Sequence, residues 1–341
     1  MVLTPIVKER RQPVAPLPRY AALQPQSLAL IVAGPTASGK SALALELAER
    51  CRGTIINADA MQVYRELRVL TARPTVEDEA RVPHALYGIR PAAQPGSVAW
   101  WRETALTAMD AARLSGRLPI LTGGSGMYFA SLTEGLASIP DPGSAARTEA
   151  RSLLKQIGPA ALHARLAEHD LLTAARLRPT DAQRVARAWE VWRGTGTGLA
   201  TWQATKADPA PWRFAAILLD PPRDELRAAI RHRLAAMLDH GVLNEVRALM
   251  AMELDPSLPV MRAHGVAELG SHLRGEISLD EASCRIVLAT GQYSRRQATW
   301  FRHHSLAEPA HLHKIPTRTA GDEQLLQRTR HDILAFIQSL G

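Results

Sequence analysis

Eight consecutive residues near the start of the chain have the types and spacing of a phosphate-binding loop. Residues 34–41 read GPTASGKS, which matches the P-loop pattern G-x-x-x-x-G-K-[ST]. In a P-loop, backbone N–H groups at the start of a helix carry partial positive charge and therefore hold phosphate oxygens. Lys40 adds a full positive charge, and the Ser41 hydroxyl is a candidate ligand for Mg²⁺. The residues that predict this di- or triphosphate site are Gly34, Pro35, Thr36, Ala37, Ser38, Gly39, Lys40 and Ser41.

The segments on either side of the loop fit the same interpretation. The apolar run at 28–33 is typical of a buried strand, and the run at 42–48 continues as a helix. Strand–loop–helix is the context in which a P-loop binds phosphate. The loop alone does not identify a reaction, because many unrelated enzymes share it.

Two more polar side chains follow predicted strands. Asp59 comes just after a strand at 54–57, and Ser125 follows two glycines after a strand at 118–122. Ligands of open α/β sheets bind at the carboxyl ends of the strands, so we expect both side chains beside the P-loop. The Asp59 carboxylate is a candidate general base or metal ligand, or else the N-cap of the next segment. Ser125 offers a hydroxyl to the same site, or else belongs to a simple strand–helix turn.

The whole chain limits the class of protein. Its 341 residues suffice for about two domains with a full core. No uninterrupted apolar run approaches ~20 residues, so we expect no membrane association. Cys51 and Cys284 are the only cysteines, which excludes a disulfide framework and indicates a reduced, cytoplasmic protein. The net charge of +8 favours a polyanionic partner such as nucleic acid, or else reflects a merely basic, arginine-rich surface.

The elements that position these residues follow a βαβ rhythm between residues 28 and 136, which is typical of a parallel sheet. Residues 138–211 contain only predicted helices, and a strand returns at 214–219. An all-helical block between sheet strands indicates an inserted subdomain. The predicted helices are 40–51, 97–115, 144–156, 159–168, 170–177, 181–193, 223–240, 241–252, 263–273, 278–302 and 322–339.

The predicted fold class is therefore α/β. We expect a P-loop NTPase-like parallel sheet flanked by helices, with an inserted all-helical subdomain and a helical C-terminal part. The expected domains are a flexible basic N-terminal arm at 1–27, a P-loop catalytic core at 28–137 and 212–305, a helical insertion at 138–211, and a C-terminal tail with a helix at 306–341.

Further sequence blocks occur in a fixed order after the P-loop, and together they resemble one family. The ordered series is similar to the bacterial tRNA dimethylallyltransferases, also called tRNA isopentenyltransferases or the IPP transferase family. The resemblance covers roughly residues 28–305. Its blocks are GPTASGKS (34–41), NADAMQVY (57–64), TARP (71–74), PHAL (83–86), TGGSGMYFASLTEGL (122–136), DAQRVARAWE (181–190), MRAHG (261–265) and TGQYSRRQATWFR (290–302).

The resemblance implies a specific reaction. In that family the N6 amine of the adenosine 3′ to the anticodon, tRNA position 37, attacks C1 of dimethylallyl diphosphate in tRNAs that read codons beginning with U. Diphosphate leaves with assistance from Mg²⁺. The implied partners are the tRNA anticodon stem-loop and dimethylallyl diphosphate, and we expect the enzyme to act as a monomer.

Three catalytic residues carry over from the family. Asp59 matches the general base, and Arg233 matches an arginine that grips the diphosphate. Ser125 stands where the family usually has Thr, and either hydroxyl can bond a phosphate oxygen. The family often has a second arginine where this chain has Ala229, so no role is transferred there.

The resemblance also implies a set of RNA contacts. Arg184 and Arg187 share one helix face and suit phosphate binding, or else form a solvated face in which Arg187 pairs with Glu190. Val266 and Gly291 depart from the tyrosine and arginine that are usual in the family. The implied tRNA-binding residues are Asp59, Ala60, Met61, Gln62, Ser125, Arg147, Gln183, Arg184, Val185, Ala186, Arg187, Met261, Arg262, Gly265, Thr290, Gln292, Tyr293, Arg295, Arg296 and Gln297.

Three alternatives remain open from the residues. A P-loop small-molecule kinase is one, because Asp220 ends an apolar run and imitates a Walker B aspartate. A prenyltransferase that acts on free adenine nucleotides is another, although such a substrate needs no extended basic surface. A non-catalytic RNA-binding module is the third, and it leaves the P-loop and Asp59 without a role.

Overall fold

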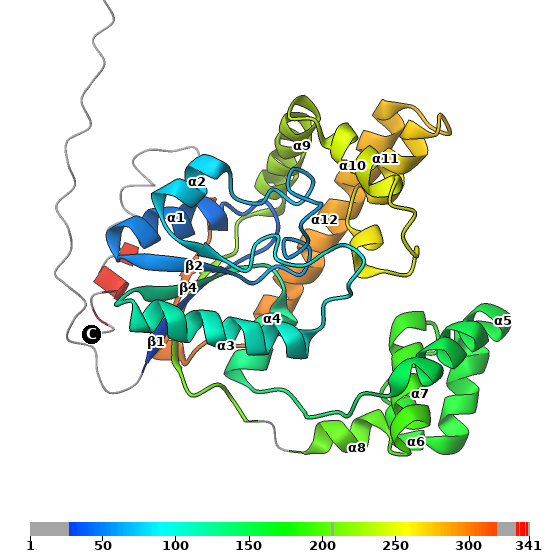
Figure 1. Cartoon of the computed structure of the whole chain (residues 1–341). Helices are drawn as coiled ribbons and strands as arrows, with labels where there is room; N and C mark the ends of the chain where they lie inside the picture. Colours follow the sequence, from blue (N-terminus) through cyan, green and yellow to red (C-terminus); the bar gives the residue numbers. More distant parts are fainter. Residues whose placement is uncertain (1–26, 206–207, 319–331, 334, 338, 340–341) are drawn as a thin grey trace, which may run out of the picture. The chain divides into compact units, whose positions relative to one another are not determined.

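The chain's structure was obtained as a computed structural model (Figure 1). The expected basic arm at 1–27 lies, except for Ser27, outside the residues that the structure describes. The expected helix at 322–339 is described only in part, and the described part of it is helical. The described residues are 27–205, 208–318, 332–333, 335–337 and 339.

The chain divides into two compact units. We call Met1–Phe129 with Pro211–Gly341 the core unit, and Ala130–Ala210 the helical unit. The helical unit begins earlier than the insertion expected at 138–211. The reason is that α4 (Gly126–Thr133) follows the sheet without a break and crosses the boundary.

A six-stranded parallel sheet forms the centre of the core unit, as the sequence predicts. Its order is β3-β2-β4-β1-β5-β6, so the strand before the P-loop lies inside the sheet. The carboxyl ends of neighbouring strands therefore meet around the P-loop. The strands are β1 (Leu28–Ala33), β2 (Gly53–Asn57), β3 (His84–Ala85), β4 (Leu118–Gly123), β5 (Arg213–Leu219) and β6 (Leu312–Ile315).

The pleat of β1 explains why helices cover both faces of the sheet. Leu30 and Val32 belong to one buried cluster with the apolar side of α1 (Lys40–Arg50). Successive side chains alternate in a strand, so Ile31 points to the other face. Figure 1 shows α3 (Val98–Leu114) across the sheet from α1. Burial on both faces accounts for the unbroken apolar run that predicted this strand.

The second half of the core unit is mostly helical. α9 (Arg223–Asp239) and α12 (Leu279–His303) lie side by side (Figure 1). None of the helices in the described part of the chain is long and apolar enough to span a membrane. The remaining elements of this half are α10 (Val242–Met250), α11 (Val266–Leu273) and the 3-10 turns Pro259–Arg262 and Pro309–His311, and the first half also contains α2 (Val76–Arg81).

One stretch of the expected C-terminal tail belongs to the sheet. Residues 312–315 form β6, which pairs with β5 and buries Ile315 in the core. The expectation of a tail over 306–341 is therefore corrected. Four residues, two of them His313 and Lys314, are too few and too polar to show a strand period.

The helical unit has its own small core. Leu162, Leu166 and Trp189 pack between α5 (Gly143–His169) and α7 (Ala182–Thr195). The helices expected at 144–156 and 159–168 form α5, whose backbone breaks at Gly158 (φ 76°, ψ 171°) just before Pro159. The sequence thus predicted the break, which proline reinforces because it supplies no N–H. The unit also contains α6 (Leu171–Ala174) and α8 (Leu199–Ala204).

Candidate active site

The P-loop makes a tight turn between β1 and α1. Ala37 and Gly39 have left-handed backbones (φ 69° and 95°), and α1 begins at the next residue. A side chain at Gly34 has no room, because a Cβ there would lie 2.8 Å from the Leu219 carbonyl oxygen. The Ser38 hydroxyl is buried and has no hydrogen-bond partner among the described residues. The loop therefore has the backbone geometry that its motif predicts.

Lys40 folds back over the loop. Its Nζ donates to the Pro35 carbonyl at 3.2 Å. Burial lowers the pKa of Lys40 to about 8, while Asp59 raises it and Arg233 lowers it by smaller amounts. Lys40 and the exposed Ser41 line the same pocket.

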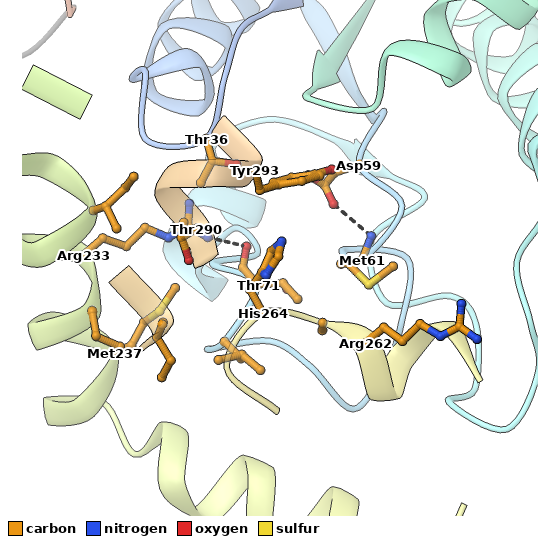
Figure 2. Close-up of a pocket in the computed structure, with 15 residues that line it drawn as sticks. Thr36, Asp59, Met61, Thr71, Arg233, Met237, Arg262, His264, Thr290 and Tyr293 are labelled. Carbon is orange, nitrogen blue, oxygen red and sulfur yellow. Dashed lines mark hydrogen bonds between the residues drawn. The ribbon is translucent and has the colours of Figure 1, made fainter. Parts of the chain in front are cut away.

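Asp59 lies at the carboxyl end of β2. Its N–H donates to Oδ1 of Asn57 at 2.9 Å. Its own Oδ1 accepts the Met61 N–H, also at 2.9 Å (Figure 2). Oδ2 accepts no hydrogen bond from the described residues. No helix begins directly after Asp59, so the N-cap interpretation does not hold. One carboxylate oxygen orients the side chain, and the other is available to a substrate.

Ser125 joins the ends of β4 and β2. Its Oγ accepts the Ala60 N–H at 3.0 Å, and its N–H donates to the Ala58 carbonyl at 3.2 Å. The two backbones approach closely at Gly123, where a Cβ would lie 2.0 Å from the Ala58 oxygen. Glycine is therefore required there, and Ser125 lies beside the loop that carries Asp59.

Arg233 reaches the site from α9. Its Nη2 donates to the Thr71 carbonyl at 3.0 Å (Figure 2). Burial lowers the pKa of Arg233, and Asp59 partly offsets this effect. Arg233 and Asp59 line both of the pockets described below.

Glu245 on α10 holds the loop that carries Thr71. Its carboxylate accepts three consecutive N–H groups, at residues 68–70, over 2.7, 2.7 and 2.8 Å. Sequence reasoning missed Glu245, because a single acid on a helix gives no motif. Its role appears only when the loop and α10 are brought together.

α12 braces the P-loop through Gln297. Its Oε1 accepts the Thr36 N–H at 2.8 Å, and its Nε2 donates to the Gly124 carbonyl at 2.9 Å. Ser294 adds a bond from its Oγ to the Thr36 carbonyl at 3.3 Å. Gln297 is 5% exposed, so its amide is engaged inside the protein. This placement departs from the RNA contact that the resemblance implied for Gln297.

Two pockets adjoin at these residues, and Figure 2 shows the second of them. The first, the phosphate-loop pocket, measures about 340 Å³ and is lined by the P-loop, Ser41 and Arg233. The second, the apolar pocket, measures about 180 Å³. They share Thr36, Asp59, Thr71 and Arg233 as a common wall. Side chains that make the second pocket apolar are Met61, Leu70, Ile230, Leu234, Met237 and Ile286.

Two rings form part of the rim of the apolar pocket. The centroids of His264 and Tyr293 lie 5.0 Å apart, and the Arg296 guanidinium lies 5.6 Å from the Tyr293 centroid. Burial raises the pKa of Tyr293. Burial, followed by the charge of Arg296, lowers the pKa of His264. Both rings are therefore neutral near pH 7.

The residues expected to contact RNA in the core unit lie in several places. Met61, Arg262, Thr290 and Tyr293 line the apolar pocket, and Arg262 points away from it (Figure 2). The other expected residues do not line this pocket. Ala60 is hydrogen-bonded to Ser125, Gln62 is hydrogen-bonded to Thr71, and Arg296 lies over the Tyr293 ring. Met261 is half-buried, Gly265 is buried with φ 103°, and Gln292 and Arg295 line a separate groove.

In the helical unit, the expected arginines are exposed (Arg184) or half-buried (Arg147 and Arg187), and each is paired locally. Arg184 pairs with Asp181 (3.5 Å) and Arg187 with Glu190 (3.2 Å), as the solvated-face alternative predicted for Arg187. Arg147 pairs with an acid of the same unit, Asp141. Gln183 is exposed, whereas Val185 and Ala186 are buried, so the side chains of these two residues do not face a ligand.

Comparisons with known proteins agree with this geometry. An IPP transferase family model matches residues 62–304, and an isopentenyl transferase model matches residues 27–87. A tRNA dimethylallyltransferase from Granulibacter bethesdensis is 61% identical over 312 residues, which cover 91% of this chain and 98% of that protein. One from Gluconacetobacter diazotrophicus is 60% identical over 309 residues, which cover 90% and 93%.

A solved structure gives the same result. The full-length tRNA isopentenylpyrophosphate transferase from Bacillus halodurans superposes with a TM-score of 0.63 at 28% identity, over 92% of this chain and 98% of that one. The identity and coverage of these relatives confirm the resemblance drawn from the motifs. The chain therefore belongs to the IPP transferase family of tRNA dimethylallyltransferases.

Proposed function

We propose that this chain transfers a dimethylallyl group from dimethylallyl diphosphate to N6 of adenosine 37 in tRNAs that read codons beginning with U. The observation that carries the proposal is the pair of adjoining pockets that meet at Asp59 and Arg233. One pocket suits a diphosphate, and the other suits an apolar group. A substrate that is charged at one end and apolar at the other fits such a pair. Family membership supports this assignment.

The phosphate-loop pocket would hold the diphosphate. The P-loop backbone, Lys40 and Arg233 supply N–H donors and two positive charges on one side of it. The Ser38 hydroxyl, which has no partner among the described residues, is a further buried polar group in the same loop. Because these charges are fixed before the reaction, they stabilise the charge that develops on the leaving diphosphate.

The same pocket fits a bound Mg²⁺. Ser41 presents an exposed hydroxyl there, and Asp59 lines the same pocket. The described residues contain no cluster of three acidic, His or Cys side chains, so the protein offers no complete cage. This suits Mg²⁺, which usually keeps several waters and binds substrate phosphates. Bound there, the ion would neutralise negative charge on the diphosphate.

Asp59 would act as the general base. The N6 lone pair forms a bond to C1 of the donor, the C1–O bond breaks, and the electron pair leaves with the diphosphate. The N6 proton passes to Asp59, whose Oδ2 is available for it. Such a base typically contributes ~10²–10⁴-fold to the rate.

The remaining parts of the substrates would occupy the apolar pocket and its rim. The five-carbon chain suits aliphatic side chains such as Leu234, Met237 and Ile286. The adenine must leave its stack to reach Asp59, because N6 is not accessible inside a stacked anticodon loop. Tyr293 and His264 offer ring surfaces near the rim for the incoming base.

The kinase alternative lacks a Walker B aspartate in the described lining of the phosphate-loop pocket. Asp220, which imitates a Walker B aspartate in the sequence, lines a different groove and not the phosphate-loop pocket. Among the described residues, Asp59 is the one acid that lines the phosphate-loop pocket, so no separate Walker B acid stands beside it. This placement favours group transfer to a nucleobase.

Mass analysis of nucleosides tests the proposal. Unmodified tRNA is incubated with the protein, Mg²⁺ and dimethylallyl diphosphate, then digested. We expect adenosine to gain one C5H8 unit, only at position 37 and only in tRNAs for codons that begin with U. AMP in place of tRNA, and ATP in place of the diphosphate, are the matched controls. Modification of AMP, or robust phosphoryl transfer from ATP without prenylation, contradicts the proposal.

A further inference from the structure

A second, larger groove lies between α9 and α12 in the core unit. It measures about 1070 Å³. Ile230 and Leu234 line both this groove and the apolar pocket, so they form the wall between the two. None of the residues assigned above to diphosphate binding or to proton transfer lines this groove. Its position gives it no part in the reaction at Asp59.

Arginines outnumber acidic residues in the lining of this groove. Five arginines and two aspartates line it. Arg223, Arg227 and Arg231 are exposed, recur every fourth residue and therefore lie along one face of α9. Arg295 faces them from α12. The side chains of these four arginines form no ion pair or hydrogen bond with other residues that the structure describes.

Several exposed arginines elsewhere in the described part of the chain have an acidic partner. Arg81, Arg113, Arg274 and Arg285, for example, each pair with a nearby acid. A row of like charges at i and i+4 destabilises a helix when nothing neutralises it. The row on α9 therefore indicates that an external anion supplies the missing counter-charge.

We propose that this groove binds the phosphate backbone of the tRNA substrate, away from the nucleotide that enters the catalytic pocket. Arginines four residues apart on a helix are separated by about 6 Å along its axis, which is comparable to the spacing of consecutive phosphates on one strand. None of the described residues that line the groove is aromatic, so bases have no ring to stack on there, and its contacts are with the backbone and carry no sequence information. The inference uses the proposed function only to take tRNA as the RNA.

We favour RNA over an acidic protein segment as the ligand of this groove. Binding sites for proteins centre on buried aromatic anchors or on arginines packed in desolvated pockets. Here the arginines are exposed, and the described lining residues include no Trp, Tyr or Phe. A protein partner is nevertheless an outcome that the experiment distinguishes.

The test removes the α9 row. In the variant R223Q/R227Q/R231Q, we expect the Kd for full-length tRNA to rise at least ~10-fold at moderate salt. The slope of log Kd against log salt should fall by roughly two to three, because up to three phosphate contacts are lost. Binding is measured by fluorescence anisotropy of labelled tRNA without dimethylallyl diphosphate. The KM for tRNA should rise in parallel, while kcat stays within twofold.

Two further variants make the result decisive. R81Q/R113Q/R274Q removes the same charge from exposed, paired positions of the core unit and should bind tRNA like the parent. R223K/R227K/R231K keeps the charge and should retain most of the affinity. If the glutamine variant, folded by circular dichroism, has the Kd and salt slope of its charge-matched control, the inference is overturned and the groove is left to a protein partner. Failure of the proposed function looks different: tRNA then gains no C5H8 with the parent protein, whatever its affinity.

Discussion

The two carboxylate oxygens of Asp59 have different roles, and a single substitution can separate them. Its Oδ1 orients the loop through the Met61 N–H, and its Oδ2 is available to the substrate. Asn keeps an oxygen for the Met61 bond but cannot accept a proton. We therefore expect Asp59→Asn to retain its fold and tRNA affinity while kcat falls ~10²–10⁴-fold.

Single-turnover prenylation with saturating dimethylallyl diphosphate measures this loss directly. The tRNA Kd of the variant is the control for folding and binding. Activity within a few-fold of the parent would mean that another group takes the proton from N6.

Lys40 makes diphosphate binding sensitive to alkaline pH. Its pKa is lowered to about 8, chiefly by burial, so the ammonium form dominates below about pH 8 and is lost above it. Only the ammonium form attracts the diphosphate. We expect kcat/KM for dimethylallyl diphosphate to fall as pH rises through about 8, by up to tenfold per pH unit.

Lys40→Arg is the matched variant for this prediction. A guanidinium stays protonated throughout this range, so its profile should be level on the alkaline side even if its activity is lower overall. An alkaline fall of equal size in both proteins would assign the titration to a different group.

At the scale of elements, α12 is a support for the P-loop. Gln297 satisfies the Thr36 N–H and the Gly124 carbonyl, which come from the ends of β1 and β4. Gln297→Ala leaves both groups without this partner, and an unmade buried hydrogen bond costs about 1–3 kcal/mol. We expect a lower Tm and a KM for dimethylallyl diphosphate raised ~10-fold, because the loop loses its fixed position.

Thr299→Ala, at an exposed position of the same helix, is the control and should change neither quantity. The tRNA Kd adds a second readout. If Gln297→Ala weakened only tRNA binding and left the diphosphate KM unchanged, Gln297 would be an RNA contact, as the family resemblance implied.

Much of the sheet could be predicted because burial leaves a strong local pattern. β1 has the predicted bounds, since an apolar run before a glycine-rich loop is difficult to mistake. β3 and β6 were missed, because strands of two and four residues are defined by the neighbour with which they pair. A pattern within one segment does not contain that information.

The residues of the candidate site also differ in whether a local pattern predicts them. The P-loop and Asp59 were predicted from motifs that lie within short segments. Gln297 bonds to Thr36, which is 261 residues away, and Glu245 bonds to Leu70, which is 175 residues away. Such long-range supports arise from the fold, and neither residue type nor local spacing distinguishes them.

The whole molecule has a net charge of +8, and its arginines differ in whether an acid is paired with them. In the helical unit, Arg184 and Arg187 are paired with exposed or half-buried acids. The Arg184–Asp181 pair is accessible to solvent, and such pairs contribute about 0–1 kcal/mol, so a phosphate can replace Asp181 at little cost. We therefore expect RNA binding at this pair to need no change in the fold of the helical unit.

We expect tRNA binding to depend steeply on salt as a result. Because several phosphate contacts release counterions, raising the salt from a low to a physiological concentration should weaken binding at least ~10-fold. In R184Q/R187Q the slope of log Kd against log salt should fall by roughly one to two. R274Q/R285Q removes two arginines that are paired in the same way but match no RNA contact of the family, and it should keep the parent's slope. A parent protein whose tRNA affinity barely changes with salt would show that the charge does not serve RNA, because each displaced counterion must appear in that slope.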